Sequence, residues 1–332
     1  MKLSELGEFA FIDRFSPGFG GEPDDAILGI GDDCAVLPRD NRSVTLITTD
    51  MLIEDSHFLR ERIPPEDLGY KSLAVNLSDI AAMGGKPEFA FLSLGMPGNT
   101  EVEWMDRFFI GLQGLCRETE VRLLGGDTTR SGKHLVINIA VIGRALKKQV
   151  KYRSAARMGD VICVTGSLGD SAAGLRLILE QLPAIGRNHT LIKAHNRPRA
   201  HLAEGAWLAG QKKVHAMMDV SDGIDSDLHR IMERSDCGAA VELSRLPCSK
   251  ELTAVCKKNG WNLYELAAAG GEDYCLLCTI DPEACEGIRQ DFREIFGRDL
   301  VAVGTITEGR TLEYHDRGAP VKLARHGFDH FA

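Results

Sequence analysis

The sequence predicts a two-domain α/β protein. Short runs rich in β-branched residues alternate with segments of helical spacing. The chain has 332 residues, of which 44% are hydrophobic, so it can bury a sizeable core, and its length suits two domains better than one. A basic stretch at 143–159 with few large apolar residues precedes a new strand pattern. We place the boundary there, giving expected domains of 1–149 and 150–332.

The elements follow in order along the chain. Strand patterns are predicted at 44–49, 89–94, 135–142 and 161–165, and helical patterns at 68–83, 101–118 and 171–182. In the first helical pattern, Asn76 and Asp79 are three residues apart and lie on neighbouring faces, above an apolar side. Polar groups on this helix are therefore available for a site.

Composition excludes several classes of protein. The chain carries 39 basic and 48 acidic residues, a formal charge of −9, which argues against nucleic acid as a partner. Residues 1–15 mix charges with short apolar pairs, so we expect no export signal, no membrane span and a cytoplasmic protein. The nine scattered cysteines are typical of reduced thiols. The only CxxC, Cys275 to Cys278, lies in a predicted strand that points its thiols to opposite faces.

Acidic residues follow one apolar run after another. In the first half they come after 26–31, 44–49 and 121–126, and the helix at 68–83 adds a fourth source; these acids are Asp32, Asp33, Asp50, Asp127 and Asp79. In the second half Asp219 and Asp222 are three apart, with Ser221 between them. Any one of these taken alone is usually a helix N-cap, a turn residue or a solvated charge.

The series as a whole points to a metal site. Two carboxylates about 4 Å apart repel by roughly 4 kcal/mol at an effective dielectric constant of about 20, so acids that converge on one cleft need cations between them. Carboxylates with adjacent Thr and Ser hydroxyls suit Mg²⁺, which also binds substrate phosphates. No His/Cys cluster suited to zinc is present in the sequence.

The common phosphate-binding loops are absent. Neither GxxxxGK[ST] nor GxGxxG occurs, and the segment that begins Gly29-Ile-Gly31 fails at the third glycine. The turn at 166–171 joins a strand to a helix, and its N–H groups could bind an anion or simply be capped by Asp170 or Ser171. Arg130, Arg144 and Arg153 could neutralise phosphates or lie on an exposed linker.

Several short motifs follow one another along the chain. They are Gly29-Ile-Gly-Asp-Asp33, Thr48-Thr-Asp50, His57-Phe58, Asn76-Leu-Ser-Asp79-Ile-Ala-Ala-Met-Gly84, Gly125-Gly-Asp127-Thr-Thr-Arg130, Asp219-Val-Ser-Asp222-Gly223, Gly270-Gly-Glu-Asp-Tyr274 and Gly327-Phe-Asp-His-Phe331. Taken together, these motifs resemble the thiamine-monophosphate kinase family, within the wider superfamily of aminoimidazole-ribotide-synthetase-like ATP enzymes. The resemblance runs in order from about residue 5 to 331.

This resemblance implies an aminoimidazole-ribotide-synthetase-like fold of two α/β domains. The N-terminal mixed sheet would form a homodimer, and the active site would lie between the domains. The implied reaction is ATP + thiamine phosphate to ADP + thiamine diphosphate, the last step of thiamine diphosphate biosynthesis. It would proceed by direct in-line transfer between phosphates, with several Mg²⁺ ions neutralising their repulsion.

The resemblance also assigns roles to individual positions. The implied Mg²⁺ ligands are Asp33, Thr48, Thr49, Asp50, Asp79, Asp127, Asp219 and Asp222, of which Asp50 and Asp127 are expected to be the catalytic pair. The implied ATP contacts are Gly126, Asp127, Arg153 and Ser221. The implied thiamine phosphate contacts are His57, Glu272 and Phe328. Phe328 stands where relatives often carry Tyr or Trp.

Each substrate position also has an ordinary structural explanation. His57 could be a partly buried histidine, Glu272 a turn residue and Phe328 part of C-terminal packing. Among related enzymes, the hydrogenase-maturation dehydratase would want a C-terminal cysteine and selenophosphate synthetase a reactive cysteine or selenocysteine near the N-terminus. Residues 329–332 and 1–31 contain no cysteine. A non-catalytic sensor of thiamine diphosphate or nucleotide would be expected to lose acidic ligands, and all the matched ones are present.

Overall fold

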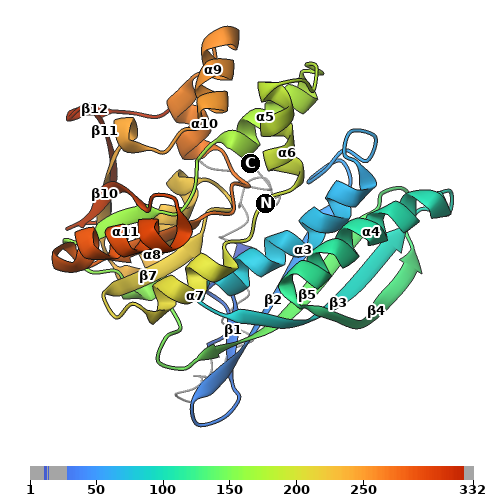
Figure 1. Cartoon of the computed structure of the whole chain (residues 1–332), viewed down its shortest axis with the longest axis horizontal. Helices are drawn as coiled ribbons and strands as arrows, with labels where there is room; N and C mark the ends of the chain where they lie inside the picture. The colour runs from blue at the N-terminus through green and yellow to red at the C-terminus, as the bar shows by residue number, and fades with distance from the viewer. Residues whose placement is uncertain (1–10, 13, 15–27, 325–332) are drawn as a thin grey trace.

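The protein is built around two β-sheets, each covered by helices (Figure 1). The computed structural model describes residues 11, 12, 14 and 28–324. The first sheet has five strands and the second has seven. The predicted two-domain α/β class is confirmed. The first sheet ends at Leu146 and the second begins at Val161.

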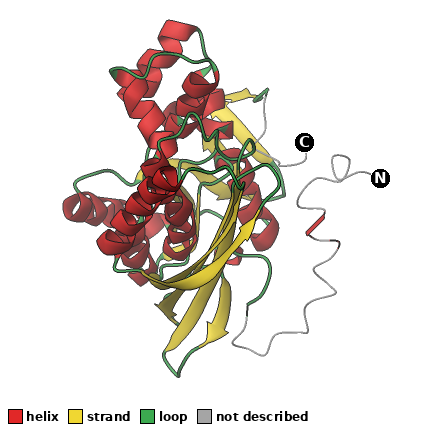
Figure 2. Cartoon of the chain, turned by 90° about the vertical axis from the view of Figure 1, so that its right-hand side faces the viewer, coloured by secondary structure: helices red, strands yellow, loops and turns green. Residues whose placement is uncertain are grey.

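The first sheet has the strand order β1-β2-β5-β3-β4. Neighbouring strands run antiparallel except β3 and β4, which are parallel. Its strands are β1 (Ala35–Pro38), β2 (Ser43–Ile53), β3 (Lys86–Met96), β4 (Arg122–Arg130) and β5 (Val136–Leu146). Helices α3 (Pro65–Ala82) and α4 (Val102–Thr119) cover one face, which we call the covered face, while no helix between residues 28 and 324 covers the opposite, outer face (Figures 1 and 2).

Helix α3 is buried almost all round, because it lies between the first sheet, α4 and the second half of the molecule. Its start has a clear local cause, since Pro65 occupies the first turn and two acids, Glu66 and Asp67, follow it. Helix α4 crosses α3 closely at two glycines. A Cβ added to Gly69 would lie 1.9 Å from Phe108 O, and one added to Gly111 would lie 1.8 Å from Glu66 O.

The second sheet has the order β12-β11-β8-β10-β6-β9-β7. Its strands are β6 (Val161–Val164), β7 (Val214–Asp219), β8 (Gly238–Glu242), β9 (Leu276–Ile280), β10 (Val301–Thr307), β11 (Leu312–Asp316) and β12 (Ala319–Val321). The accompanying helices are α5 (Asp170–Leu179), α6 (Arg187–Asn196), α7 (Leu202–Gly210), α8 (Ile224–Ser235), α9 (Lys250–Asn259), α10 (Leu263–Ala269) and α11 (Pro282–Phe296), with short 3₁₀ turns η2 (Arg153–Ala155) and η3 (Leu243–Arg245).

The central strands of this sheet are buried on both faces. Cys275 packs into one core and Cys278 into the other, so the prediction that these thiols point to opposite faces is confirmed. All nine cysteines are free thiols. Across the described part of the chain, no helix combines the length and apolar character needed to cross a membrane.

The predicted segments are confirmed as elements, but two details of the strand predictions were wrong. Asp50 and Asp127 were expected at the exits of apolar runs, whereas each lies inside a strand, in β2 and β4. Pairing with β5 carries β2 on to Ile53, opposite Val136. Main-chain ladder hydrogen bonds do not depend on side-chain polarity, so a strand continues through an acidic residue when its neighbour continues.

Candidate active site

Three aspartates from three different elements meet at one point between the two sheets. Asp33 comes from the segment before β1, Asp79 from α3 and Asp219 from the end of β7. Each offers a carboxylate oxygen that lies within 4.8 Å of the other two. We call these three residues the carboxylate cluster. Two of its members come from the first half of the chain and one from the second, as the sequence predicted.

Neighbouring polar groups hold the cluster in place. The Thr48 hydroxyl on β2 donates a hydrogen bond to the Asp79 carboxylate. One turn earlier on α3, the side chain of Asn76 accepts a hydrogen bond of 3.0 Å from the main-chain N–H of Asp50. The spacing of Asn76 and Asp79 therefore does what the sequence indicated, because it places both side chains of α3 against β2.

The electrostatics of the cluster are unfavourable without cations. Burial, with repulsion from Asp33, raises the pKa of Asp219 to about 8. Burial and repulsion from Asp222 raise the pKa of Asp50 to about 6. Burial, then Asp50, Asp219 and Asp33, raise the pKa of Asp79 well above its usual value. Asp50 and Asp222 are therefore close enough to the cluster to share its negative field.

One arginine offsets part of this charge. Arg153, in η2 between the two sheets, forms an ion pair with Asp33. Its Nε lies 3.7 Å from Asp32 Oδ1, and its main-chain N–H donates a hydrogen bond to Asp32 Oδ2. Burial and repulsion from Asp33 still raise the pKa of Asp32 to about 7. The predicted nucleotide contact Arg153 therefore lies at the cluster, bound to the two adjacent aspartates.

The donor set fits a hard divalent cation. Oδ2 of Asp33 and Oδ2 of Asp219 are buried and have no hydrogen-bond partner among the described residues. A buried carboxylate oxygen without a donor is costly, and a cation removes that cost. Oxygen-only donors are the ligands that Mg²⁺ prefers. The buried Cys34, next to Asp33 in the chain, has a pKa raised by burial and by Asp79, so it does not contribute a thiolate.

A second polar group, which we call the acceptor group, lies around Glu272. The side chain of Lys71 on α3 places Nζ 2.9 Å from one Glu272 oxygen and 3.0 Å from the other. Nδ1 of His195 on α6 lies 3.1 Å from Glu272 Oε2. Lys71 is completely buried, whereas the Glu272 side chain keeps 24% exposure. Glu272 thus presents a partly open, charged carboxylate.

The loop that carries Glu272 is fixed by its backbone. The N–H of Glu272 donates to Ser221 O at 2.7 Å, and that of Tyr274 donates to Val220 O at 2.8 Å. Glu272 has a φ of 64° and Tyr274 a φ of 49°, both in the left-handed region. The predicted residues Ser221 and Glu272 therefore lie side by side at the exit of β7. Strained backbone of this kind is often kept at functional sites.

His57 lies on the same side of the molecule as the acceptor group. Its Nδ1 accepts a hydrogen bond of 3.0 Å from Ile53 N, and it is among the groups that lower the pKa of Glu272. Phe328, the third predicted substrate residue, lies outside the described residues. The structure thus brings two of the three predicted acceptor contacts together.

Gly126, Asp127 and Thr49 lie apart from the cluster in the single chain. Asp127 pairs across the sheet with Ser93, then Asn138, then Met51, so three strand spacings, ~14 Å, separate it from β2. Asp127 and the residues paired with it across the sheet lie on the outer face, as does Thr49. Asp50 lies on the covered face, which it shares with Thr48. Alternation along β2 therefore sends the two predicted threonine ligands to opposite faces.

The turn at 166–171 is capped from within the protein. The Asp273 carboxylate accepts hydrogen bonds from Gly169 N at 2.6 Å and from Ser171 N at 3.2 Å. An internal carboxylate thus takes the place that an external anion would need at the start of α5. Neither Asp170 nor Ser171 is the cap; the N-cap position is Gly169.

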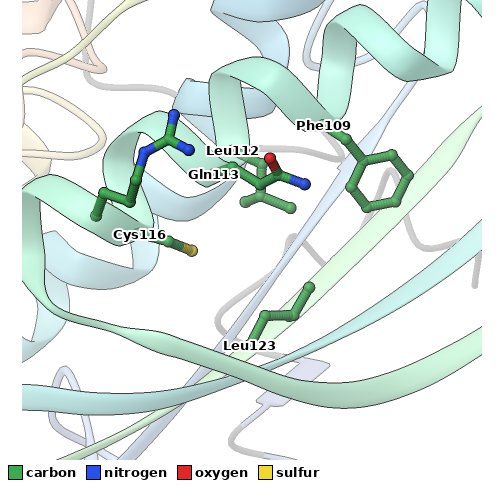
Figure 3. Close-up of a pocket in the computed structure, with 6 residues that line it drawn as sticks. Phe109, Leu112, Gln113, Cys116 and Leu123 are labelled. Carbon is green, nitrogen blue, oxygen red and sulfur yellow. The ribbon is translucent and has the colours of Figure 1, made fainter.

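A shallow pocket of about 270 Å³ lies between α4 and β4, away from the carboxylates (Figure 3). Its lining is mostly apolar and comes from Phe109, Leu112, Gln113, Cys116, Arg117 and Leu123. In the part of the chain that the structure describes, no carboxylate lines this pocket, and Gln113 and Arg117 are its only charged or amide side chains. We therefore place the active site at the carboxylate cluster and not at this pocket.

Two residues at the site, Lys71 and His195, were not singled out from the sequence. Asp32 belongs to the predicted acidic series without an assigned ligand role, and so does Asp227, which is buried and accepts a 3.2 Å hydrogen bond from Asp222 N. Lys71 had one available signal, a lysine at a buried position of a helix. His195 had none, because its partner Glu272 is distant in the sequence.

Both halves of the chain match models of known protein families. Residues 31–145 match the model described as AIR synthase related protein, N-terminal domain, and residues 157–317 match its C-terminal domain. The fold and the interdomain carboxylate site therefore define a two-domain protein of the AIR synthase related class. A HypE–HypF complex at 18% identity and a TM-score of 0.75 shares this fold.

Relatives of higher sequence identity identify the family within this class. The thiamine-monophosphate kinase of Escherichia coli strain K12 is 39% identical, with 98% of each chain covered. That of Aquifex aeolicus is 37% identical over 94% of this chain and 98% of the relative. A structure described as AaThiL complexed with AMPPCP and TMP superposes with a TM-score of 0.87 at 34% identity, covering 99% of both chains. The chain belongs to the thiamine-monophosphate kinase family.

Proposed function

We propose that this enzyme transfers the γ-phosphoryl group of ATP to thiamine monophosphate, giving ADP and thiamine diphosphate. The observation that carries the proposal is the carboxylate cluster, whose buried oxygens come from both halves of the chain beside a partly open Glu272. Family membership at 39% identity supports the same reaction. The described helices and the charge of −9 give no support to a membrane or nucleic-acid partner, and a cytoplasmic location stays a prediction.

The proposed magnesium ligands are the cluster and its neighbours. Asp33, Asp79 and Asp219 would hold Mg²⁺ directly, with Asp50, Asp222 and Thr48 beside them. When bound, Mg²⁺ supplies charge neutralisation between the phosphates of donor and acceptor. We propose more than one ion, because the acids around the cluster outnumber the one arginine that offsets them.

The residues of the chain position the two substrates. The acceptor is a phosphate whose oxygen is already anionic, so no strong general base is required and orientation dominates catalysis. Glu272 and His57 would hold the thiamine end, and Phe328 is proposed to complete that contact. Arg153 and Ser221 would contact the nucleotide, with Arg153 exchanging part of its hold on Asp33 for a phosphate oxygen. We propose direct in-line transfer without a phosphoenzyme.

We further propose domains of 1–149 and 150–332 and a homodimer formed by the first sheet. No helix between residues 28 and 324 covers the outer face of that sheet, which exposes Met51 by 50% and Phe91 by 39%. Edge strand β4 is exposed along its whole length, including Leu123 and Leu124. Exposed edges and apolar sheet faces are normally covered in soluble proteins. A second copy would cover them and bring its Gly126 and Asp127 to the Thr49 side of β2.

A coupled ADP-release assay tests the reaction. With ATP and Mg²⁺, thiamine phosphate should support turnover and unphosphorylated thiamine should not, because the proposed site neutralises repulsion between two phosphates. Activity on thiamine alone would overturn the phosphate-acceptor assignment. Stereochemical analysis with chiral γ-phosphoryl ATP tests the transfer itself: inversion is expected, and retention would indicate a phosphoenzyme.

A further inference from the structure

The acceptor group contains a lysine that the proposed reaction does not explain. Lys71 lies in the middle of α3 with no exposed surface, and it reaches across 201 sequence positions to Glu272. A buried ammonium is costly unless it is paired. Both Glu272 oxygens lie within hydrogen-bond distance of its Nζ, at 2.9 and 3.0 Å. The pair joins the helix that covers the first sheet to the loop between α10 and β9.

His195 holds the same carboxylate from a second direction. Its Nδ1 lies 3.1 Å from Glu272 Oε2 and 3.0 Å from Ser171 Oγ. Burial and the charge of Lys71 lower the pKa of His195 to about 4, so the ring is neutral near pH 7. An ionised carboxylate only accepts hydrogen bonds, so Nδ1 carries the proton. Lys71 therefore supplies the positive charge of the pair.

The groups that face Glu272 come from every element around it. They are Lys71 on α3, His195 on α6, His57 after β2, and the adjacent Asp273 and Tyr274 of its own loop. Burial favours the neutral acid, but Lys71, then His195 and His57, outweigh it and lower the pKa of Glu272. The 24% of the Glu272 side chain that stays exposed is thus a charged surface held by groups behind it.

We propose that Lys71 and His195 are positioning residues for the acceptor substrate. They orient the Glu272 carboxylate and keep it ionised, so that it faces the cationic thiazolium ring and the amino group of thiamine phosphate. This rests on the proposed function. The two residues act through Glu272 and do not touch the reacting phosphates. Acceptor recognition then depends on a contact between the two halves of the chain, because Lys71 and Glu272 lie in different halves.

The test compares Lys71→Met and Lys71→Arg with the wild type from pH 6 to 9. In Lys71→Met, Glu272 loses its main counter-charge, so burial should favour its neutral form. The KM for thiamine phosphate should then rise about 10- to 100-fold at pH 7 and fall again as the pH rises, while the KM for ATP stays unchanged. The wild-type KM should be flat over this range, and Lys71→Arg should restore much of the affinity.

Lys151→Met is the matched control, since Lys151 is also buried but donates only to main-chain oxygens of Gln211 and Val214. It should lower stability without any pH-dependent KM for thiamine phosphate. If Lys71→Met does not fold, His195→Asn provides the second variant. It should raise the KM for thiamine phosphate severalfold and leave the KM for ATP unchanged. Equal changes in both KM values, or an unchanged KM for thiamine phosphate, would overturn the proposal. Failure of the wild type to use thiamine phosphate would instead refute the proposed function.

Discussion

At the scale of single residues, the carboxylate cluster is where sequence and structure agree best. Asp33, Asp79 and Asp219 were all predicted as metal ligands, and their carboxylates converge within 4.8 Å. The prediction was possible because the ordinary structural roles of acidic residues explain each acid separately, whereas a metal site explains the whole series. Lys71 and His195 were not predicted, because their importance depends on contacts with Glu272 that only the folded chain creates.

Replacing Asp50 by Asn removes one negative charge at nearly constant volume. We expect turnover to fall about 100-fold or more, because metal-assisted charge neutralisation is worth several kcal/mol at the transition state. Without metal, the midpoint temperature of thermal unfolding should be unchanged or slightly higher, since repulsion between Asp50 and Asp222 is relieved. Asp291→Asn on the exposed side of α11 is the control and should retain wild-type kinetics. Near-normal turnover of Asp50→Asn would refute its assignment.

The raised pKa values predict how pH affects the metal-free protein. Asp219 ionises near pH 3.8 in the unfolded chain but at about 8 in the folded one, because of burial and Asp33. Between these values the folded state binds a proton that the unfolded state has lost, so stability falls as pH rises. Each such carboxyl contributes a slope of about 1.4 kcal/mol per pH unit.

Thermal unfolding in EDTA from pH 5 to 8 measures this slope, and saturating Mg²⁺ should flatten it. In EDTA, Asp219→Asn should show a shallower slope than the wild type. Identical slopes for the two proteins would mean that Asp219 does not titrate in this range.

At the scale of elements, the predictions located the segments but not their ends or their pairing. Periodicity identified α3, α4, α5 and four strands, β2, β3, β5 and β6, because an apolar face must be buried in any fold. Strand β2 nevertheless runs past Asp50 to Ile53, since its length is set by pairing with β5. The same pairing places Asp127 three strands from β2. Strand order is a long-range property, which local pattern does not encode.

The close crossing of α3 and α4 gives a prediction about packing. Gly69→Ala would place a methyl group 1.9 Å from Phe108 O, so the helices must separate. We expect a loss of about 1–3 kcal/mol in the free energy of unfolding by urea. Gly114→Ala, in the same helix pair but with nothing within 4 Å, should instead stabilise by up to about 1 kcal/mol. Equal effects would show that the helices do not cross as described.

At the scale of the whole molecule, the active site draws on both halves of the chain and, in our proposal, on a second subunit. Asp127 and Asp50 cannot meet within one chain, because the sheet separates them by three strands and two faces. A homodimer makes a distinct prediction. A mixed dimer of an Asp50→Asn subunit and an Asp127→Asn subunit should contain one intact site and one doubly defective site.

Such a heterodimer, purified with two different affinity tags, should recover about half of the wild-type turnover although each homodimer is inactive. Mass measurement in solution provides the control for assembly. An inactive heterodimer of the correct mass would show that both residues serve the same subunit.

The central claim is that the site joins two phosphates with the help of Mg²⁺ held by the carboxylate cluster. Phosphorus-31 NMR of the wild-type protein with ATP, thiamine phosphate and Mg²⁺ tests it most directly. We predict equimolar ADP and thiamine diphosphate, with neither formed in EDTA nor by Asp79→Asn. Inorganic phosphate in place of thiamine diphosphate, or undiminished product formation in EDTA, would contradict the account.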